Sequence, residues 1–207
     1  KEADYLDKYF EENIYPVLTP MAVDSSRPFP LIRNKSLNIG ALLQKKGDKD
    51  EILEFATVQV PSVLNRIVEL PKEGKMRKVI LLEEVIERNI RKLFLNYDVI
   101  CAHPFRIMRN ADLTIDEDEA EDLLKEIEKQ IKKRQWGEAI RLEVENGMDK
   151  RLLKILVKEL GIEERNIYKI DGPLDLTFLM KMYGLEGFEH LKAPKYEPQQ
   201  VPELPNG

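Results

Sequence analysis

The sequence has little cysteine and little histidine, with one cysteine and two histidines among 207 residues. A single cysteine cannot form an internal disulfide. Cys101 stands between apolar neighbours, so we expect it to fill the core rather than act as a nucleophile. Long apolar runs are also missing: the run 79–82 is far too short to cross a bilayer, and residues 1–7 show no signal-peptide pattern. We therefore expect a cytoplasmic protein.

An excess of one charge is lacking too. The chain carries 33 Lys and Arg against 38 Asp and Glu, a net charge of -5, and its basic residues are scattered among carboxylates. This balance disfavours nucleic acid as a partner. The sequence has no Gly-rich phosphate loop, no Gly-x-Ser-x-Gly turn and no kinase-like set of catalytic Asp and Asn. It predicts no catalytic residue and no metal-binding residue of its own.

Apolar periodicity predicts an α+β fold whose first half is rich in strands. A helix is expected over 3–13, and prolines keep the following stretch, 14–30, extended. Aliphatic runs at 37–43 and 53–60 flank a polar loop, which is typical of a β-hairpin. The run 66–70 is expected to add a third strand.

The second half alternates strands and helices. Strands are predicted at 78–82, 99–109, 138–145 and 167–170, and helices at 83–94, 116–131, 152–160 and 176–183. Within 138–145 the apolar Ile140, Leu142 and Val144 alternate with charged residues, which predicts one buried face. The prediction is a mixed sheet with helices packed on it, in one domain over 1–193, followed by a proline-rich linker over 194–207.

Two features have both a functional and a structural interpretation. His103 lies in a predicted strand, where an imidazole can be phosphorylated or bind metal. No second ligand stands at suitable spacing, which favours a structural histidine. The acidic residues between 112 and 122 can hold Mg²⁺ together with phosphate. Carboxylates at a helix N-terminus also complement the helix dipole, and this second interpretation is favoured.

The candidate anion-binding residues are basic side chains near the proline-rich stretch and on two predicted strands. Guanidinium groups bind phosphate oxygens through two parallel hydrogen bonds, although solvated or ion-paired surface arginines are the more frequent alternative. The candidates are Arg27, Arg33, Lys35, Arg106, Arg109 and Arg141.

Seven short blocks are distributed along the chain from residue 14 to residue 176, namely IYPVLTPMAVD (14–24), RPFPLI (27–32), NKSLNIG (34–40), PFRIMRNADL (104–113), DEDEAEDLL (116–124), RLEVE (141–145) and DGPLDL (171–176). In this order they closely resemble the middle, or head, domain of bacterial polyphosphate kinase. Several separate blocks in the same order are far more specific than any one short motif.

The resemblance implies a parent enzyme of four parts: an N-terminal helical domain, this head domain, and two C-terminal domains that hold the chemistry. The parent reversibly transfers the γ-phosphate of ATP to inorganic polyphosphate through a phosphohistidine. ATP, ADP and Mg²⁺ bind outside this segment, so no cofactor is expected on it. Neither His103 nor His190 falls in a matching motif. The implied location is cytoplasmic, with peripheral membrane association of the parent left open.

The predicted role of this segment is non-catalytic. It scaffolds the N-terminal and C-terminal domains of the same polypeptide, takes part in a homodimer or homo-oligomer, and helps to wall the path of polyphosphate. The alternative is an autonomous polyphosphate-binding module that uses the surface arginines. A third hypothesis is a stand-alone enzyme that acts through His103. The isolated segment is expected to be inactive.

Overall fold

The structure, a computed structural model, describes residues 1–23, 28–47, 52–71, 74, 76–110, 137–194 and 196. The chain divides into two compact units, Lys1–Leu176 and Thr177–Gly207. The helix predicted over 116–131 lies outside the described residues, as does the linker predicted over 194–207 except for Pro194 and Tyr196. The single domain predicted over 1–193 stays a prediction.

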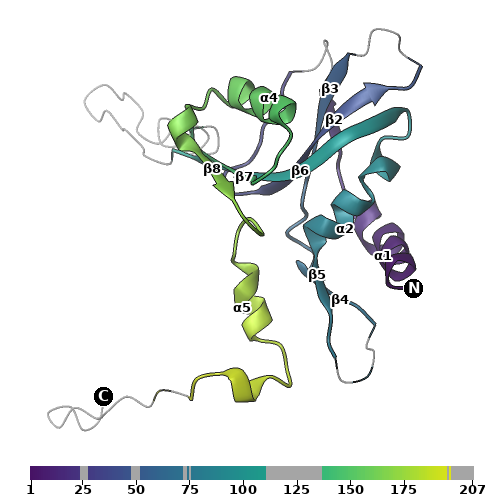
Figure 1. Cartoon of the computed structure of the whole chain (residues 1–207), viewed down its shortest axis with the longest axis vertical. Coiled ribbons are helices and arrows are strands. Elements are labelled where there is room, and N and C mark those ends of the chain that lie inside the picture. Colours follow the sequence, from purple (N-terminus) through teal and green to yellow (C-terminus); the bar gives the residue numbers. More distant parts are fainter. Residues whose placement is uncertain are drawn as a thin grey trace, which may run out of the picture. The chain divides into compact units, whose positions relative to one another are not determined.

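A six-stranded mixed sheet forms the centre of the first unit (Figure 1). Its strands lie in the order β1, β3, β2, β6, β7, β8, and all neighbouring strands are antiparallel except β7 and β8. The predicted α+β class is confirmed. The strands are β1 (Met21–Val23), β2 (Leu37–Lys45), β3 (Leu53–Gln59), β6 (Tyr97–Arg109), β7 (Ala139–Glu145) and β8 (Ile167–Ile170).

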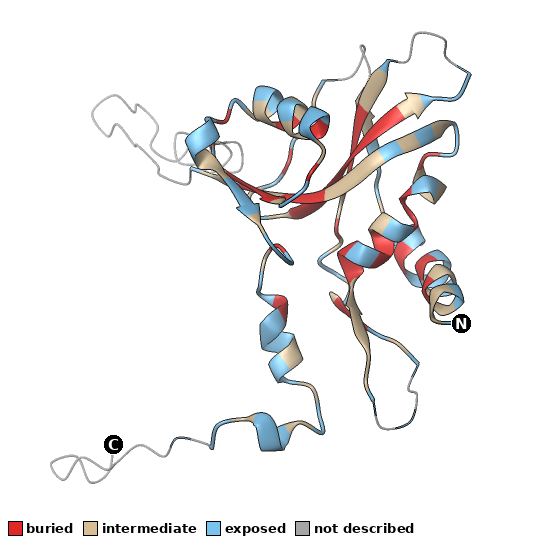
Figure 2. Cartoon of the chain, viewed as in Figure 1, coloured by how far each residue is buried: buried red, intermediate tan, exposed pale blue. Residues whose placement is uncertain are grey.

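The predicted hairpin is confirmed as β2 and β3, which pair from Asn38 opposite Gln59 to Gln44 opposite Leu53. Successive side chains of a strand point to opposite faces. Ile39 therefore enters one core cluster, and Leu42 enters the other. The buried residues of these central strands appear in red in Figure 2. Burial on both faces explains why the hairpin sequence is so continuously aliphatic.

The N-terminal helices and α2 cover one face of the sheet. Helix α1 (Glu2–Tyr9) continues as a π-helical turn (Phe10–Ile14) and a 3₁₀ turn (Tyr15–Val17). Helix α2 (Leu82–Arg88) is followed by a 3₁₀ turn (Ile90–Leu93). Their apolar residues share one core cluster with Ile39 of β2.

The predicted helix 83–94 was wrong in its length, because the α-helix ends at Arg88. Asn89 leaves the helical conformation, with φ -103° and ψ 8°. Its side-chain amide donates a hydrogen bond to the Val85 carbonyl at 3.1 Å. Asparagine side chains compete with backbone donors in this way, which favours the end of a helix.

Helix α4 (Lys150–Leu160) covers the opposite face. Asp149 caps its start by accepting a hydrogen bond from the Arg151 backbone N–H at 2.8 Å. Leu152 and Leu156 are fully buried in the second core cluster. The helix ends at Gly161, whose φ of 64° is a left-handed conformation that glycine adopts without a steric cost. The helix and its glycine stop are as predicted.

The strand predicted over 66–70 does form, but it does not extend the hairpin. It is β4 (Ile67–Glu69), and it pairs with β5 (Val79–Leu81) in a separate two-stranded sheet. The Leu82 backbone N–H, next to β5, donates to the Arg66 carbonyl at 2.8 Å. The predicted strand is therefore confirmed, and its pairing partner is β5 rather than the hairpin.

The prediction that Ile140, Leu142 and Val144 of β7 are all buried is only partly correct. Leu142 and Val144 are fully buried, whereas Ile140 is 46% exposed. The register passes from Met108 opposite Arg141 to Arg109 opposite Ala139, so a bulge leaves Ile140 out of the pairing. Glu143, expected on the polar face, is buried.

The second unit contains α5 (Phe178–Tyr183), close to the helix predicted over 176–183, and a 3₁₀ turn (Glu189–Leu191). A further 3₁₀ turn (Glu164–Asn166) precedes β8 in the first unit. Among the described residues, no helix combines the length and the apolar character that crossing a membrane requires.

Candidate functional site

Two candidate residues from the sequence, Arg106 and Arg141, meet at one buried carboxylate on the sheet. Arg106 of β6 and Glu143 of β7 stand directly opposite each other, and Arg106 Nη1 lies 3.2 Å from Glu143 Oε2. Arg141 Nε lies 2.8 Å from the other oxygen, Glu143 Oε1. The side chains of Arg106 and Glu143 are only 13% and 9% exposed. Buried charges of this kind need their partners, because desolvation is costly.

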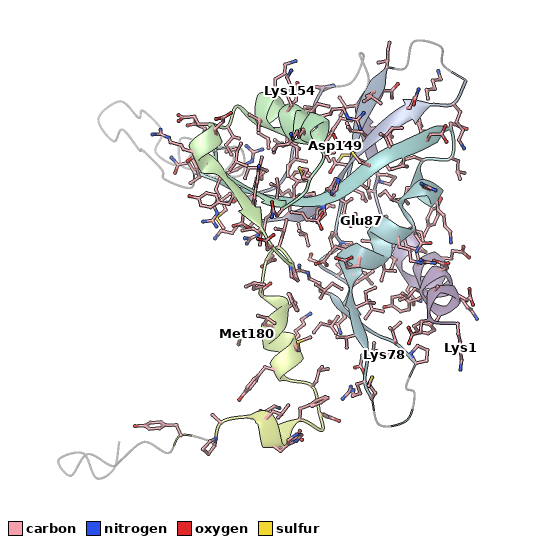
Figure 3. All side chains as sticks on the ribbon, viewed as in Figure 1. Lys1, Lys78, Glu87, Asp149, Lys154 and Met180 are labelled. Carbon is pink, nitrogen blue, oxygen red and sulfur yellow. The ribbon has the colours of Figure 1, made fainter. Side chains whose placement is uncertain are left out.

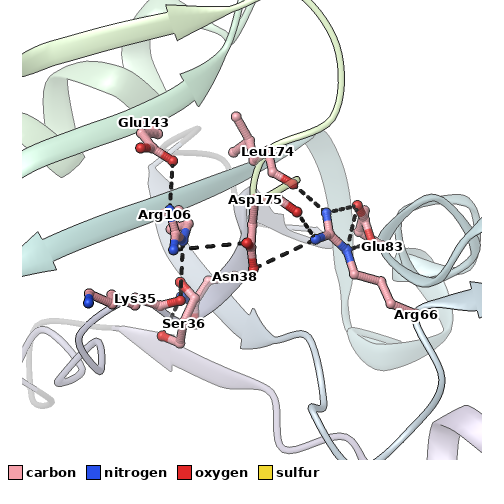
Figure 4. A network of polar contacts seen from close by, with 9 residues as sticks. All are labelled: Lys35, Ser36, Asn38, Arg66, Glu83, Arg106, Glu143, Leu174 and Asp175. Carbon is pink, nitrogen blue, oxygen red and sulfur yellow. Dashed lines mark hydrogen bonds and ion pairs between the residues drawn. The ribbon is translucent and has the colours of Figure 1, made fainter. Parts of the chain in front are cut away.

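Arg106 extends the contacts beyond the two strands. Its Nε donates to the Lys35 carbonyl at 3.3 Å, and its Nη2 lies 3.9 Å from Asp175 Oδ1 (Figure 4). The strand therefore contacts both the loop before β2 and the segment after β8. Figure 4 shows the Asp175 side chain between the two arginines, Arg106 and Arg66.

Arg66 forms the second centre of the network. Its Nε lies 3.2 and 3.0 Å from the two Glu83 oxygens, and its Nη2 lies 2.5 Å from Glu83 Oε1. The guanidinium also donates to the backbone carbonyls of Leu174 and Asp175. Its Nη1 lies 3.7 Å from the Asp175 carboxylate. We call Arg66, Glu83, Asp175, Arg106, Glu143 and Arg141 the arginine–carboxylate network.

The sequence analysis missed Arg66, Glu83 and Asp175. One signal was present: Glu83 stands three residues before Ile86, an inward position of α2. A carboxylate at an inward helical position predicts a buried cation as its partner. No local pattern identifies that cation, since Arg66 lies 17 residues earlier in the sequence.

Arg141 is also packed against an aromatic ring. Its guanidinium carbon lies 4.0 Å from the centroid of the Tyr168 ring on β8. Such a contact adds a cation–π attraction and shields one face of the guanidinium. Arg141 therefore contacts both Glu143 on its own strand and Tyr168 on the edge strand β8.

Arg109 is held by backbone oxygens rather than by a carboxylate. Its Nε donates to the Ile32 carbonyl at 3.0 Å, and its Nη1 donates to the Gly137 carbonyl at 2.8 Å. Burial lowers the pKa of this guanidinium. Among the described residues, the side chain joins the loop before β2 to the start of β7.

Arg33 and Lys35 differ from these arginines because both are exposed and neither forms an ion pair with another described residue. Lys35 has a φ of 61°, which is uncommon for a residue other than glycine. Its backbone N–H donates to the Ile107 carbonyl at 2.9 Å, and the Ser36 hydroxyl donates to the Arg33 carbonyl at 2.8 Å. These contacts hold the turn and leave the two cations in solvent. Arg27 lies outside the described residues.

His103 has a carboxylate partner, as expected for a structural histidine. Its Nδ1 lies 2.9 Å from Glu145 Oε2. Cys101 is half-buried, and burial raises the pKa of its thiol. A raised pKa lowers the thiolate fraction and so disfavours a nucleophilic role.

Carboxylates of α2 lie near this histidine pair. Burial, with smaller contributions from the charges of Glu145 and Glu84, raises the pKa of Glu87 to about 7 (Figure 3). Burial likewise raises the pKa of Glu84. Within the part of the chain that the structure describes, no group of three or more His, Cys, Asp or Glu side chains is arranged to hold a metal ion. The acidic residues 112–122 lie outside that part.

Comparisons with known proteins agree over nearly the whole chain. The model of the polyphosphate kinase middle-domain family matches residues 1–182. A polyphosphate kinase from Halalkalibacterium halodurans is 50% identical over 207 residues, which is 99% of this chain and 29% of the relative. A polyphosphate kinase from Bacillus cereus is 46% identical over 209 residues, or 99% of this chain and 30% of the relative.

A solved structure supports the fold. The crystal structure of polyphosphate kinase from Porphyromonas gingivalis is similar to this chain, with a TM-score of 0.72 and 22% sequence identity. The similarity covers 100% of this chain and 29% of that protein. The chain thus spans less than a third of the length of the relatives named here.

Proposed function

The chain belongs to the polyphosphate kinase middle-domain family, and from this premise we propose that it is the non-catalytic scaffold of an ATP:polyphosphate phosphotransferase. The whole protein transfers the γ-phosphate of ATP reversibly to the end of inorganic polyphosphate through a phosphohistidine. ATP, ADP and Mg²⁺ bind to the parts of the protein that this chain does not include. The names and identities of the relatives support this activity.

The arginine–carboxylate network is the observation that carries the scaffold role. Two of the six candidate cations, Arg106 and Arg109, donate hydrogen bonds to groups of the chain itself, and a third, Arg141, forms an ion pair with Glu143. Phosphoryl transfer needs cations whose donors point at phosphate oxygens. Guanidinium groups that instead bind distant segments of the chain stabilise the fold of the domain, and a scaffold requires a stable fold.

A trans-complementation assay tests this role. The 207-residue chain alone, incubated with labelled ATP, is expected to form no phosphohistidine and no polyphosphate. Mixed with the separately expressed remaining parts of the protein, it is expected to restore polyphosphate synthesis. Phosphohistidine or nucleotide turnover in the chain alone would contradict a non-catalytic role.

The scaffold is also proposed to contribute to a homodimer. Exposed apolar side chains near the β1 edge of the sheet support this, because Tyr15, Val17 and Met21 are 49%, 43% and 38% exposed. Sedimentation of the complete protein is expected to show a dimer that Val17→Asp weakens. Val63→Asp serves as the control, since Val63 is 81% exposed in a turn. Monomer alone for the unmutated protein would reject the dimer.

Polyphosphate binding by the domain itself is the second candidate function, and Arg33 and Lys35 favour it. Both are exposed cations on a turn held by its own hydrogen bonds. A preformed pair of cations binds a polyanion with a smaller loss of conformational entropy. Polyanion binding releases counterions, so the affinity is expected to fall steeply with added salt.

The matched test compares two double variants in a polyphosphate-binding titration at low and high salt. Arg33→Gln with Lys35→Asn removes the cations, and asparagine tolerates the positive φ at 35. Lys150→Gln with Lys154→Gln removes the same charge from the exposed side of α4. The first pair is expected to weaken binding and flatten the salt dependence more than the second. If the two double variants weakened binding equally, the binding would be general electrostatic attraction rather than recognition by Arg33 and Lys35.

A further inference from the structure

The segment between β8 and α5 contains one buried residue and one half-buried residue. Residues 171–173 are exposed, Leu174 is buried and Asp175 half-buried, and residues 176 and 177 are exposed again. Leu174 and Asp175 are therefore a short anchor between two solvent-exposed stretches. This anchor lies close to the end of the first unit, because the second unit begins at Thr177.

The anchor is held through contacts to its backbone as well as to the Asp175 side chain. Arg66 donates to both carbonyls, those of Leu174 and Asp175. The Asp175 carboxylate lies between two guanidinium groups, 3.7 Å from Arg66 Nη1 and 3.9 Å from Arg106 Nη2. Asp175 also has a φ of 53°, a left-handed conformation that aspartate adopts more readily than most residues other than glycine. Together, these contacts fix the direction of the backbone at Leu174 and Asp175.

Glu83 holds Arg66 in place for this task. Its two oxygens accept from Nε and Nη2, which leaves the outer edge of the guanidinium facing residues 174 and 175 (Figure 4). The side chains of Arg66 and Glu83 are 13% and 4% exposed, so water competes little for these contacts. A lysine has no planar fork and cannot reproduce this set of hydrogen bonds.

We propose that Arg66 is a positioning residue: held by Glu83, it locks Leu174 and Asp175 and so determines how the polypeptide leaves this domain toward the rest of the protein. This inference rests on the proposed function, because the reaction it serves belongs to the whole protein. Reacting groups supplied by different parts of one protein must be held in register, and a misplacement of about 1 Å costs on the order of 100-fold in rate. A fixed exit direction meets that requirement.

Hydrogen exchange of the complete protein tests the lock directly. Arg66→Gln is expected to speed exchange of the amides in 174–178 by roughly tenfold or more, because the segment opens locally without the grip. The amides of β2 and β6 are expected to exchange as before. Arg88→Gln is the matched control. Arg88 lies on α2, as Glu83 does, but it forms an exposed ion pair with Asp7 of α1. Unchanged exchange at 174–178 in Arg66→Gln would overturn the proposal.

Polyphosphate synthesis by the complete protein tests the positioning role. Arg66→Gln is expected to lower kcat by roughly 10- to 100-fold while the KM for ATP changes less than about twofold. Arg66→Lys, which keeps the charge but not the fork, is expected to fall between Arg66→Gln and the unmutated protein. Faster exchange with an unchanged kcat would overturn the positioning role and leave a purely structural anchor.

Two controls separate this proposal from the function on which it rests. If the unmutated complete protein made no polyphosphate, the proposed function would fail, while the exchange experiment would still decide whether the lock exists. If Arg66→Gln does not fold, Arg66→Lys replaces it: lysine keeps a cation beside Glu83 but lacks the planar fork that reaches both backbone carbonyls. It is expected to speed exchange at 174–178 in the same way, and an unchanged rate would also overturn the proposal.

Discussion

The two ends of α2 carry ion pairs of the same chemistry in opposite surroundings. At its first turn, Glu83 pairs with Arg66, and their side chains are 4% and 13% exposed. At its last turn, Arg88 pairs with Asp7 of α1, and these side chains are 46% and 36% exposed. In both pairs, Nε and Nη2 of the guanidinium donate to the two different oxygens of the carboxylate. Only their burial and their further partners differ.

This comparison teaches that distance alone does not rank ion pairs. Arg88 and Asp7 raise and lower one another's pKa through their hydrogen bond, yet both remain in contact with water. Water replaces a lost partner at such a site. The side chains of Glu83 and Arg66 are largely shielded from water, so removing one partner leaves a poorly solvated charge. Four tests sharpen this contrast.

The largest expected effect is that of Glu83→Ala. It leaves Arg66 buried without its carboxylate and is expected to lower the free energy of unfolding by about 3 kcal/mol. Urea unfolding of the 207-residue chain measures this loss. Asp7→Ala, which removes the carboxylate of the exposed pair, is the control and is expected to have a much smaller effect. Similar losses in the two variants would show that burial does not separate the two ends of α2.

The second effect concerns Arg109, a half-buried cation whose side chain donates to backbone carbonyls rather than to a carboxylate. Arg109→Met keeps most of the volume of the side chain but leaves the carbonyls of Ile32 and Gly137 without their donor. The expected loss in the free energy of unfolding is about 1 to 2 kcal/mol. Lys154→Met, on the exposed side of α4, controls for the added apolar surface. A loss no larger than that of the control would mean that water takes the place of the guanidinium.

The third effect is a pH dependence of stability that arises from Glu87 on α2. The pKa of Glu87 is raised from its ordinary value of 4.5 to about 7, so the folded chain keeps a proton that the unfolded chain has released. The free energy of unfolding is therefore expected to fall as the pH rises from 4.5 to 7. Glu87→Gln is expected to remove this slope and to stabilise the chain at neutral pH by about 1 kcal/mol, after allowance for solvent screening of a half-buried group.

Chemical unfolding at several pH values measures this slope. Glu84→Gln is the informative neighbour, because the charge of Glu84 contributes to the raised pKa of Glu87. It is expected to reduce the slope without abolishing it. A Glu87→Gln variant that keeps the full pH dependence would assign the slope to another group, of which Glu84, whose pKa is also raised, is the first candidate.

The smallest effect is expected at the exposed end of α2. Arg88→Gln is expected to change the urea midpoint only slightly, because both side chains of the pair are well solvated. Any change is expected to vanish in about 1 M NaCl, where exposed charges are screened within a few ångströms. The same salt is expected to leave the large effect of Glu83→Ala in place. A salt-insensitive loss in Arg88→Gln would mean that the side chain stabilises the fold by packing.

Much of the fold was predictable because its elements carry local signals. The hairpin of β2 and β3 follows from two aliphatic runs around a polar loop, and the end of α4 follows from Gly161. The pairing of β4 was not predictable, because a short strand takes its partner from chain packing rather than from its own pattern. The bulge that exposes Ile140 was hidden for a related reason, since alternation alone does not show a skipped residue.

The candidate site was predictable only in part. The sequence singled out Arg106 and Arg141 as cations of interest, and the structure places both on Glu143. Whether Arg33, Lys35 or any other candidate touches polyphosphate stays a prediction. Arg66 and Asp175 escaped notice because their contacts span 109 residues, and no local periodicity encodes such a contact.

By itself, the sequence determined the α+β class, the main strands and helices, and the family, since each depends on local pattern or on ordered motifs. Only the tertiary structure decided which charges are buried together. Arginine and glutamate look alike in a sequence whether they lie in solvent or in a core. What separates Glu83 from Asp7 is the loss of water around it, and that loss arises only when segments far apart in the chain pack against one another.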